Sequence, residues 1–290
     1  MTAFRVAHLT DAHLPTHGGF GFGELLSKRG LSAINWAKSR RRLHLRAVAD
    51  ALRDDIRAHA PDHVAMTGDI TNFGLPREMA AAAEWLSGFG PAEAVSFVPG
   101  NHDAMTKGFE ADLAALLAPF ATGDEGGAFP WLRRRGPLAL IGVSTAIPTL
   151  PFLAQGAAGP AQVSALRERL AAAAGATPVI LIHHPPTWLA PARKALRDRR
   201  ALAAALGAGG AALVLHGHDH RNELSWIDGA RGRIPVLGAP AASTPPGRGK
   251  EAAEWRLLSF RGGGEVEVLR RALGPAGFAE RGRFRLRLPS

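Results

Sequence analysis

The sequence predicts an α/β fold in which polar side chains meet along a rim formed by the ends of the strands. Short apolar runs typical of buried strands alternate with longer runs at helical spacing, which is the pattern of α/β domains. Several of the apolar runs end directly in Asp, Asn or His. Because ligands of open α/β sheets bind at the carboxyl ends of strands, these side chains predict a functional site. The central example is the run at 94–98, which leads into Gly100, Asn101, His102 and Asp103.

The remaining elements follow in regular order along the chain. Buried strands are expected over 4–10, 63–67, 94–98, 138–144, 179–182 and 213–216. Helices are expected over 41–59, 76–86, 107–118, 162–174 and 192–206. From about 233 the chain becomes β-rich, with meander strands at 234–237, 255–260 and 265–269 and a basic edge strand at 283–288. Neither a repeat nor a linker is evident, so one domain over 1–290 is expected.

Composition narrows the class of protein. Hydrophobic residues make up 46% and charged residues 21%, as in soluble globular proteins. The absence of cysteine excludes disulfides, thiolate metal sites and cysteine nucleophiles. Neither an apolar run of about 18 residues nor a basic-then-apolar leader is present, so a cytoplasmic location is expected. The net charge of +10 suits an anionic partner and equally fits general solubility.

Two segments leave their roles open. The insert at about 18–48 is basic and amphipathic, which fits a contact with an anionic membrane, a lid over an amphiphilic ligand, or a helical excursion packed on the core. Its apolar side chains are Phe20, Phe22, Leu25, Leu26, Ile34 and Trp36, and its cations are Lys28, Arg29, Arg40, Arg41 and Arg42. The apolar loop at 146–160 is either a wall of a substrate pocket or a buried connection.

Seven residues offer carboxylate, amide and imidazole donors, which suit Mn²⁺, Fe or Zn²⁺. They are Asp11, His13, Asp69, Asn101, His183, His218 and His220. Asp11 and His13 are two residues apart, as are His218 and His220, and each pair would share a face in an extended segment. If one Asp binds two ions, the set makes two four-ligand sites. Such a pair of ions, about 3.5–4 Å apart, keeps a positive charge that suits a phosphate ester.

The five blocks that carry these residues resemble the motifs of the calcineurin-like metallophosphoesterases. The blocks are Asp11 to His13, Gly68-Asp69, Gly100 to Asp103, His183 and Gly217 to His220, and the resemblance spans roughly 4–240. It implies a four-layer αββα sandwich of two mixed β-sheets with a dinuclear metal site at the strand rim. It also implies two divalent ions, with Mn²⁺ favoured, and a metal-bound hydroxide as nucleophile.

The resemblance further implies a role for each site residue. Asp11, His13 and His220 bind one ion, Asn101, His183 and His218 bind the other, and Asp69 bridges them. His102 is a non-ligand histidine near the scissile phosphate, where it stabilises developing charge or protonates the leaving oxygen. Asp103 either orients His102 or has a structural role. Among the remaining histidines, His184 is expected to point away from the face of His183. His8 and His216 are expected to lie in the core or directly behind the ligands. His17, His44, His59 and His63 are expected to be surface or packing residues, and His17 and His44 alternatively touch substrate phosphate.

The motifs do not select a substrate. The insert, together with Pro240 to Ser243, resembles a bacterial subgroup similar to the UDP-2,3-diacylglucosamine pyrophosphatases of lipid A synthesis. This implies a lipid nucleotide substrate and a peripheral position on the inner membrane. The alternatives are a soluble phosphodiesterase for cyclic AMP or small diesters, and a non-catalytic metal-binding scaffold, a use of this fold seen in a retromer subunit. Nucleic acid is not expected, because no basic groove interleaved with aromatic residues is evident. The sequence leaves the oligomeric state open.

Overall fold

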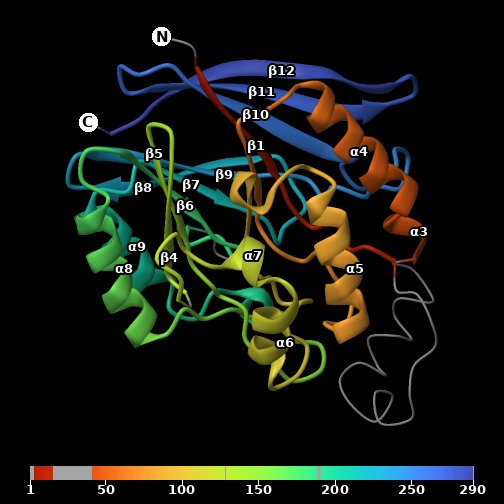
Figure 1. The fold of residues 1–290 in the computed structure, drawn as a ribbon, viewed down its shortest axis with the longest axis horizontal. Coiled ribbons are helices and arrows are strands. Elements are labelled where there is room, and N and C mark those ends of the chain that lie inside the picture. Colours follow the sequence, from red (N-terminus) through yellow and green to blue (C-terminus); the bar gives the residue numbers. More distant parts are fainter. Residues whose placement is uncertain (1–2, 16–40, 128, 188–190, 290) are drawn as a thin grey trace.

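The computed structural model describes residues 3–15, 41–127, 129–187 and 191–289. Two six-stranded β-sheets lie at the centre, and helices cover the outer face of each one (Figure 1). Each sheet contains both parallel and antiparallel pairs. The expected four-layer αββα sandwich of two mixed sheets is therefore confirmed.

The first sheet has the strand order β12-β11-β10-β1-β2-β3. Its strands are β1 (Phe4–Leu9), β2 (His63–Met66), β3 (Val95–Phe97), β10 (Glu254–Phe260), β11 (Glu265–Gly274) and β12 (Gly277–Arg287). β1, β2 and β3 are parallel, whereas β10, β11 and β12 form an antiparallel meander that joins the sheet at β1. The predicted basic edge strand is confirmed as β12, which ends the strand order.

The second sheet has the strand order β4-β5-β6-β7-β9-β8. Its strands are β4 (Trp131–Arg135), β5 (Leu138–Gly142), β6 (Thr177–Leu181), β7 (Leu213–His216), β8 (Glu223–Gly229) and β9 (Gly232–Gly238). Sequence reasoning missed β4 and β8, the two edge strands, and β8 starts the β-rich part earlier than expected. β4 looks too polar for a strand, but its buried Arg133 donates hydrogen bonds to the carbonyl oxygens of Val95 at 2.6 Å and Pro119 at 2.7 Å.

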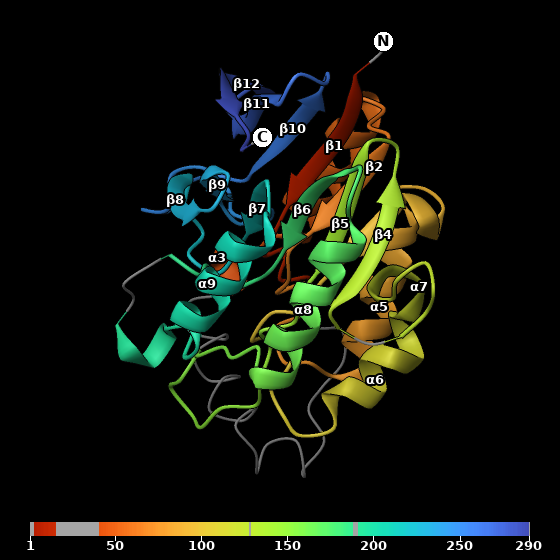
Figure 2. The same ribbon diagram turned by 90° about the vertical axis from the view of Figure 1, so that its left-hand side faces the viewer.

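The helices occupy the two outer layers. α4 (Arg46–Ala58), α5 (Pro76–Ser87), α6 (Phe109–Leu116) and α7 (Ala118–Ala121) pack on the first sheet, and α8 (Pro160–Ala172) and α9 (Arg199–Gly209) pack on the second. Figure 2, turned by 90°, shows α8 and α9 in front of β5, β6 and β7. No helix in the described ranges is long and apolar enough to cross a bilayer.

Three of the predicted helices are divided. The expected helix over 41–59 becomes the short α3 (Arg41–Leu43) and α4, and the one over 107–118 becomes α6 and α7. The expected helix over 192–206 becomes a 3₁₀ turn, η3 (Ala192–Lys194), followed by α9. Asp198 lies between them and accepts the backbone N–H groups of Ala158 and Gly159. Residues 16–40, which hold most of the predicted insert and His17, lie outside the described residues.

The buried apolar side chains form three layers. Successive residues of a strand point to opposite faces of its sheet, so they enter different layers. On β5, Leu138 and Leu140 face the layer between the two sheets, whereas Ala139 and Ile141 face α8 and α9. A third layer lies between the first sheet and α4 to α7. The layers hold the two sheets face to face, so the loops at their strand ends share one rim.

His63, at the start of β2, makes folding stability sensitive to acid. It is fully buried, with Nε2 2.9 Å from Ser96 Oγ. Burial, followed by the nearby charges of Arg135 and Arg133, lowers the pKa of the imidazole to about 3, with Asp124 opposing weakly. Because the folded pKa lies below the unfolded value of 6.5, the unfolded chain binds more protons between these two pH values. Stability is complete above pH 6.5 and falls as the pH drops through this window.

We expect the substitution His63→Gln to reduce this acid sensitivity. Between pH 7 and pH 4 the wild-type protein should lose roughly 3 kcal/mol more unfolding free energy than the variant, at about 1.36 kcal/mol per pKa unit. Denaturant unfolding at several pH values measures the difference. The control His59→Gln, at the half-buried end of α4, should follow the wild-type profile. Identical profiles for His63→Gln and wild type would contradict the prediction.

Candidate metal centre

The rim at the strand ends brings all seven candidate ligands together. They are Asp11 and His13 after β1, Asp69 after β2, Asn101 after β3, His183 after β6, and His218 and His220 after β7. β1, β2 and β3 run parallel, as do β6 and β7, so their carboxyl ends lie on one side of each sheet. The site lies where the strand-end pattern of the sequence predicts it.

One group of donors surrounds His13. The distance from His13 Nε2 is 3.4 Å to His220 Nε2, 3.7 Å to Asp11 Oδ1 and 3.9 Å to Asp69 Oδ2. His220 Nε2 also lies 2.9 Å from Asp11 Oδ1. Donors that bind one ion at about 2.0–2.2 Å are about 3–4 Å apart, so this spacing fits a single ion. His220 is the partly exposed member, whereas the other three side chains are buried.

A second group lies on the other side of Asp69. His183 Nε2 is 3.4 Å from Asp69 Oδ2, and His218 Nδ1 is 3.0 Å from Asn101 Oδ1. The ring centroids of His183 and His218 are 5.3 Å apart. All four side chains are buried. The group therefore offers two imidazoles, one amide oxygen and the shared carboxylate, all buried at the rim.

Asp69 joins the two groups through one oxygen. Its Oδ2 lies between His13 Nε2 and His183 Nε2, and its Oδ1 accepts the backbone N–H of His102 at 2.7 Å. His183 Nε2 is buried without a hydrogen-bond partner, which marks a position where the protein leaves a donor atom for a ligand. A carboxylate placed between two groups of imidazoles would suit a dinuclear metal site, with Asp69 contributing to both halves.

The local backbone differs from the expectation. Five of the seven candidates have a positive φ angle: Asp11, His13, Asp69, His218 and His220. The strands end before these residues, so the reasoning that each pair shares a face of an extended segment is wrong. Asp11 and His13 do meet, but His218 joins His183 and His220 joins His13. Backbone in this sparsely populated region is typical of functional sites, where packing holds residues in strained conformations.

Two glycines in the motifs are required by close approach. A Cβ at Gly100 would collide with the Asp69 carboxylate and would lie 2.6 Å from the Asp69 backbone nitrogen. Gly68 has φ +96°, and a Cβ there would lie 2.5 Å from His183 Nδ1. The Gly-Asp and Gly-Asn-His-Asp motifs therefore let three loops approach within contact distance of Asp69.

Comparison with protein families identifies the chain. A family model described as "Calcineurin-like phosphoesterase" matches residues 4–222. The chain belongs to this family. The match covers all seven candidate ligands, as the sequence resemblance predicts. A comparison with curated proteins finds no match.

Solved structures that share the fold of this calcineurin-like phosphoesterase include a plant phosphatase and a Plasmodium anchor protein. A purple acid phosphatase, PPD1, from yellow lupin seeds is 12% identical with a TM-score of 0.61, and the match covers 99% of this chain and 54% of that one. The chain thus spans about half the length of that phosphatase. GAP50, the anchor in the inner membrane complex of Plasmodium, is 12% identical with a TM-score of 0.56, covering 100% of this chain and 90% of that one. At this identity, the similarity shows the fold.

In this phosphoesterase, Asp69 and His183 shift each other's pKa values. Burial by itself would raise the pKa of the Asp69 carboxyl, but His183, then His102 and His13, outweigh burial and hold it well below its usual value. Burial likewise would lower the pKa of His183, and Asp69 outweighs it and raises that pKa to about 10. Asp69 is therefore a carboxylate, the form that binds cations.

His102 lies beside the two groups without joining either. Its ring meets the His13 ring edge-on, with centroids 4.9 Å apart, and its Nδ1 lies 2.8 Å from the Asn72 carbonyl oxygen. A carbonyl only accepts, so Nδ1 carries the proton of this hydrogen bond and Nε2 is the other ring nitrogen. His102 is half-buried, so its ring reaches the edge of the site.

Asp103 organises the loops under the site. Its fully buried carboxylate accepts backbone N–H groups from Asp69 and Gly100, each at 2.8 Å, and from Thr71 at 2.9 Å. The Thr71 hydroxyl donates to it as well, at 2.8 Å. These contacts hold the loops after β2 and β3 together, which supports the structural alternative for Asp103 and orients His102 only through the backbone.

Sequence reasoning misplaced one other histidine, His184. β6 ends at Leu181, so alternation no longer applies at His184, whose ring lies 4.3 Å from the His218 ring. Its nitrogens are engaged: Nε2 lies 3.3 Å from the Ala154 carbonyl oxygen and Nδ1 2.8 Å from the Thr145 hydroxyl. His184 therefore contacts the second group of donors, and its ligand nitrogen lies within 4.8 Å of those of His183 and His218. His44 also lies at the site, which agrees with the alternative that places it near the substrate. His8 and His216 are core residues, as expected.

Proposed function

We propose that this protein is a metal-dependent phosphohydrolase that cleaves a phosphodiester or pyrophosphate bond. The observation that carries the proposal is the position of Asp69 Oδ2 between His13 and His183, with the other donors around them. The donor set contains oxygen and nitrogen without sulfur, which suits Mn²⁺, Fe or Zn²⁺. Two divalent ions held there would neutralise phosphoryl charge and lower the pKa of a bound water.

The chain orients its ligands before an ion or substrate arrives. Asp11, His13 and His220 would hold one ion, Asn101, His183 and His218 the other, and Asp69 both. His13 Nδ1 lies 3.2 Å from the Thr71 carbonyl oxygen and His183 Nδ1 lies 2.7 Å from that of Thr67. Because a carbonyl only accepts, each Nδ1 carries a proton, and Nε2 is the nitrogen whose lone pair would bind a metal in the neutral imidazole.

His102 is the group placed to move a proton. Its Nδ1–H is engaged by Asn72, so Nε2 is the nitrogen that would carry a second, transferable proton in the imidazolium form. From that atom the ring would donate to a phosphoryl oxygen as charge develops, or to the leaving oxygen as the bond breaks. The backbone N–H of His102 meanwhile fixes Asp69, so one residue connects the proton donor with the shared carboxylate.

For the substrate, we propose a lipid nucleotide of the UDP-2,3-diacylglucosamine type, cleaved at an anionic membrane surface. Leu150 and Phe152, on the loop after β5, are 73% and 81% exposed, so this tip is not a buried connection. The loop reaches the rim through Ala154, whose carbonyl oxygen lies 3.3 Å from His184 Nε2 and whose N–H donates to the carbonyl of Arg193. The exposed apolar side chains of this loop lie near the exposed Arg193, and this combination favours an amphiphilic ligand.

The decisive test compares substrates on Mn²⁺-loaded enzyme. We expect kcat/KM for UDP-2,3-diacylglucosamine to exceed that for cyclic AMP and for bis(p-nitrophenyl) phosphate by more than about 100-fold. Phe152→Asn should lower only the lipid value, by about 10-fold, because it removes about 1.4 kcal/mol of apolar contact. Asn tolerates the positive φ of this position. Leu224→Asn, on β8 and 43% exposed, is the matched control and should change neither value.

Other outcomes select the alternatives. A preference for cyclic AMP, with no effect of Phe152→Asn, would indicate a soluble nucleotide phosphodiesterase. Hydrolysis of none of the three substrates by protein that holds two ions would favour the scaffold alternative, and the structural relative GAP50 is described as an anchor. Sedimentation with anionic vesicles tests the membrane contact separately, and recovery of all protein in the supernatant would contradict it.

A further inference from the structure

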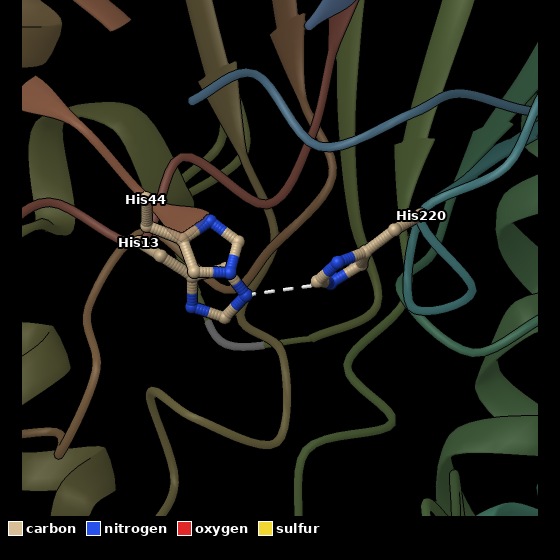
Figure 3. A group of neighbouring side chains, drawn as sticks. All are labelled: His13, His44 and His220. Carbon is tan, nitrogen blue, oxygen red and sulfur yellow. Dashed lines mark hydrogen bonds between the residues drawn. The ribbon is translucent and has the colours of Figure 1, made fainter. Parts of the chain in front are cut away.

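A third histidine joins the first group of donors. His44 lies between α3 and α4 and is buried. Its ring centroid lies 4.3 Å from that of His13 and 5.6 Å from that of His220. A ligand nitrogen from each of the three residues lies within 4.8 Å of the other two. Figure 3 shows the His44 and His13 rings together, facing His220 across a short gap.

Contacts with the loop before β10 hold His44 in this position. Its Nδ1 lies 2.8 Å from Ser243 Oγ, and the N–H of the next residue, Leu45, donates to the Ser243 carbonyl at 3.0 Å. Ala242, beside Ser243, donates its N–H to the carbonyl of Thr10, which directly precedes Asp11. The start of α4, the loop before β10 and the end of β1 therefore form one connected frame, and His44 points from it into the site.

The hydrogen bond between His44 and Ser243 is of the kind that orients a metal-binding histidine. With Nδ1 engaged by the hydroxyl, Nε2 is the nitrogen of His44 on the side of His13 Nε2 (Figure 3). His13 and His183 follow the same arrangement, in which an oxygen engages Nδ1 and Nε2 faces the other donors. A partner on the far nitrogen fixes the ring and the tautomer of ligating histidines.

We propose that His44 is a further ligand of the ion held by Asp11, His13 and His220, with Ser243 as its positioning residue. This inference rests on the proposed dinuclear site and assigns that site its metal preference. His44 adds a third imidazole to one half of the site, whereas the other half has two and an amide oxygen. Imidazole favours Zn²⁺, Fe and related transition ions over Mg²⁺, so the two halves differ and the first prefers a transition metal.

Metal binding tests the proposal directly. Metal-free wild type, His44→Ala, Ser243→Ala and the remote control His59→Ala are titrated with Co²⁺, and bound metal and the visible Co²⁺ absorption are recorded. We expect His44→Ala to weaken one of two sites by roughly 100-fold and to change the absorption of that site alone. Ser243→Ala should weaken the same site by about 10-fold, within the range for loss of an outer partner. His59→Ala should match wild type, and Mg²⁺ should fail to displace Co²⁺ from the affected site.

The outcomes separate this inference from the proposed function. Two bound ions in wild type, with unchanged affinity and absorption in folded His44→Ala, would overturn the assignment of His44 while leaving the dinuclear site intact. A raised KM with unchanged metal binding would assign His44 to the substrate and likewise overturn it. Wild-type protein that binds no ion would instead contradict the proposed function. If His44→Ala does not fold, Ser243→Ala decides, and unchanged Co²⁺ affinity of that variant overturns the proposal.

Discussion

Asp69→Asn should lower kcat/KM for bis(p-nitrophenyl) phosphate by more than about 10³-fold and should reduce the bound metal from two ions to one or none. The Oδ2 atom of Asp69 lies 3.9 Å from His13 Nε2 and 3.4 Å from His183 Nε2, so the charge of this carboxylate serves both halves of the site. Asparagine keeps the shape of the side chain and an oxygen that can accept the His102 N–H. It removes the negative charge and half of the bridging capacity, which costs transition-state stabilisation of several kcal/mol.

Metal analysis by mass spectrometry and steady-state kinetics measure both effects of Asp69→Asn. The matched control is Asp54→Asn, on the exposed side of α4, which should keep two ions and full activity. Unfolding of the metal-free proteins should show that Asp69→Asn still folds, because the hydrogen bonds of Asp103 continue to join the loops. Retention of two ions and wild-type kcat/KM in Asp69→Asn would contradict the bridging assignment.

His102→Gln should lower kcat by about 10²–10⁴-fold for a diester with an alkyl leaving group while leaving the metal content at two ions. The substitution removes the group that can carry a proton on Nε2, and glutamine still has an N–H that can reach the Asn72 carbonyl. A leaving group such as p-nitrophenolate needs no proton, so a general acid predicts a much smaller loss, below about 10-fold, for bis(p-nitrophenyl) phosphate.

The comparison of the two leaving groups decides the role of His102. An equal loss for both substrates would assign His102 to stabilisation of charge on the phosphoryl oxygens rather than to protonation. An unchanged kcat for both would show that His102 takes no part in the reaction. His59→Gln controls for loss of an imidazole elsewhere, because His59 lies at the end of α4, where it contacts Trp255.

The local pattern of apolar residues predicts the central strands of the sheets and misses the edge strands. Apolar runs such as 138–144 and 179–182 lie in the centre of a sheet, where both faces are buried, so composition alone marks them as strands. β4 and β8 lie at sheet edges and carry polar residues, so they lack this signal. In β4, the charge of Arg133 is accommodated by backbone carbonyls from other elements, which a local pattern does not contain.

The sequence by itself determined the donors of the site, since each follows its strand within a few residues and strand ends of one sheet share a rim. The tertiary structure decided how these donors combine. His218 and His220 are neighbours in sequence yet turn to different groups, because positive φ angles replace strand alternation there. His13 and His220, 207 residues apart, meet only when the two sheets pack face to face. His44 joins them because Ser243, 199 residues away, holds its ring, a contact that depends on packing of distant segments and on no local motif.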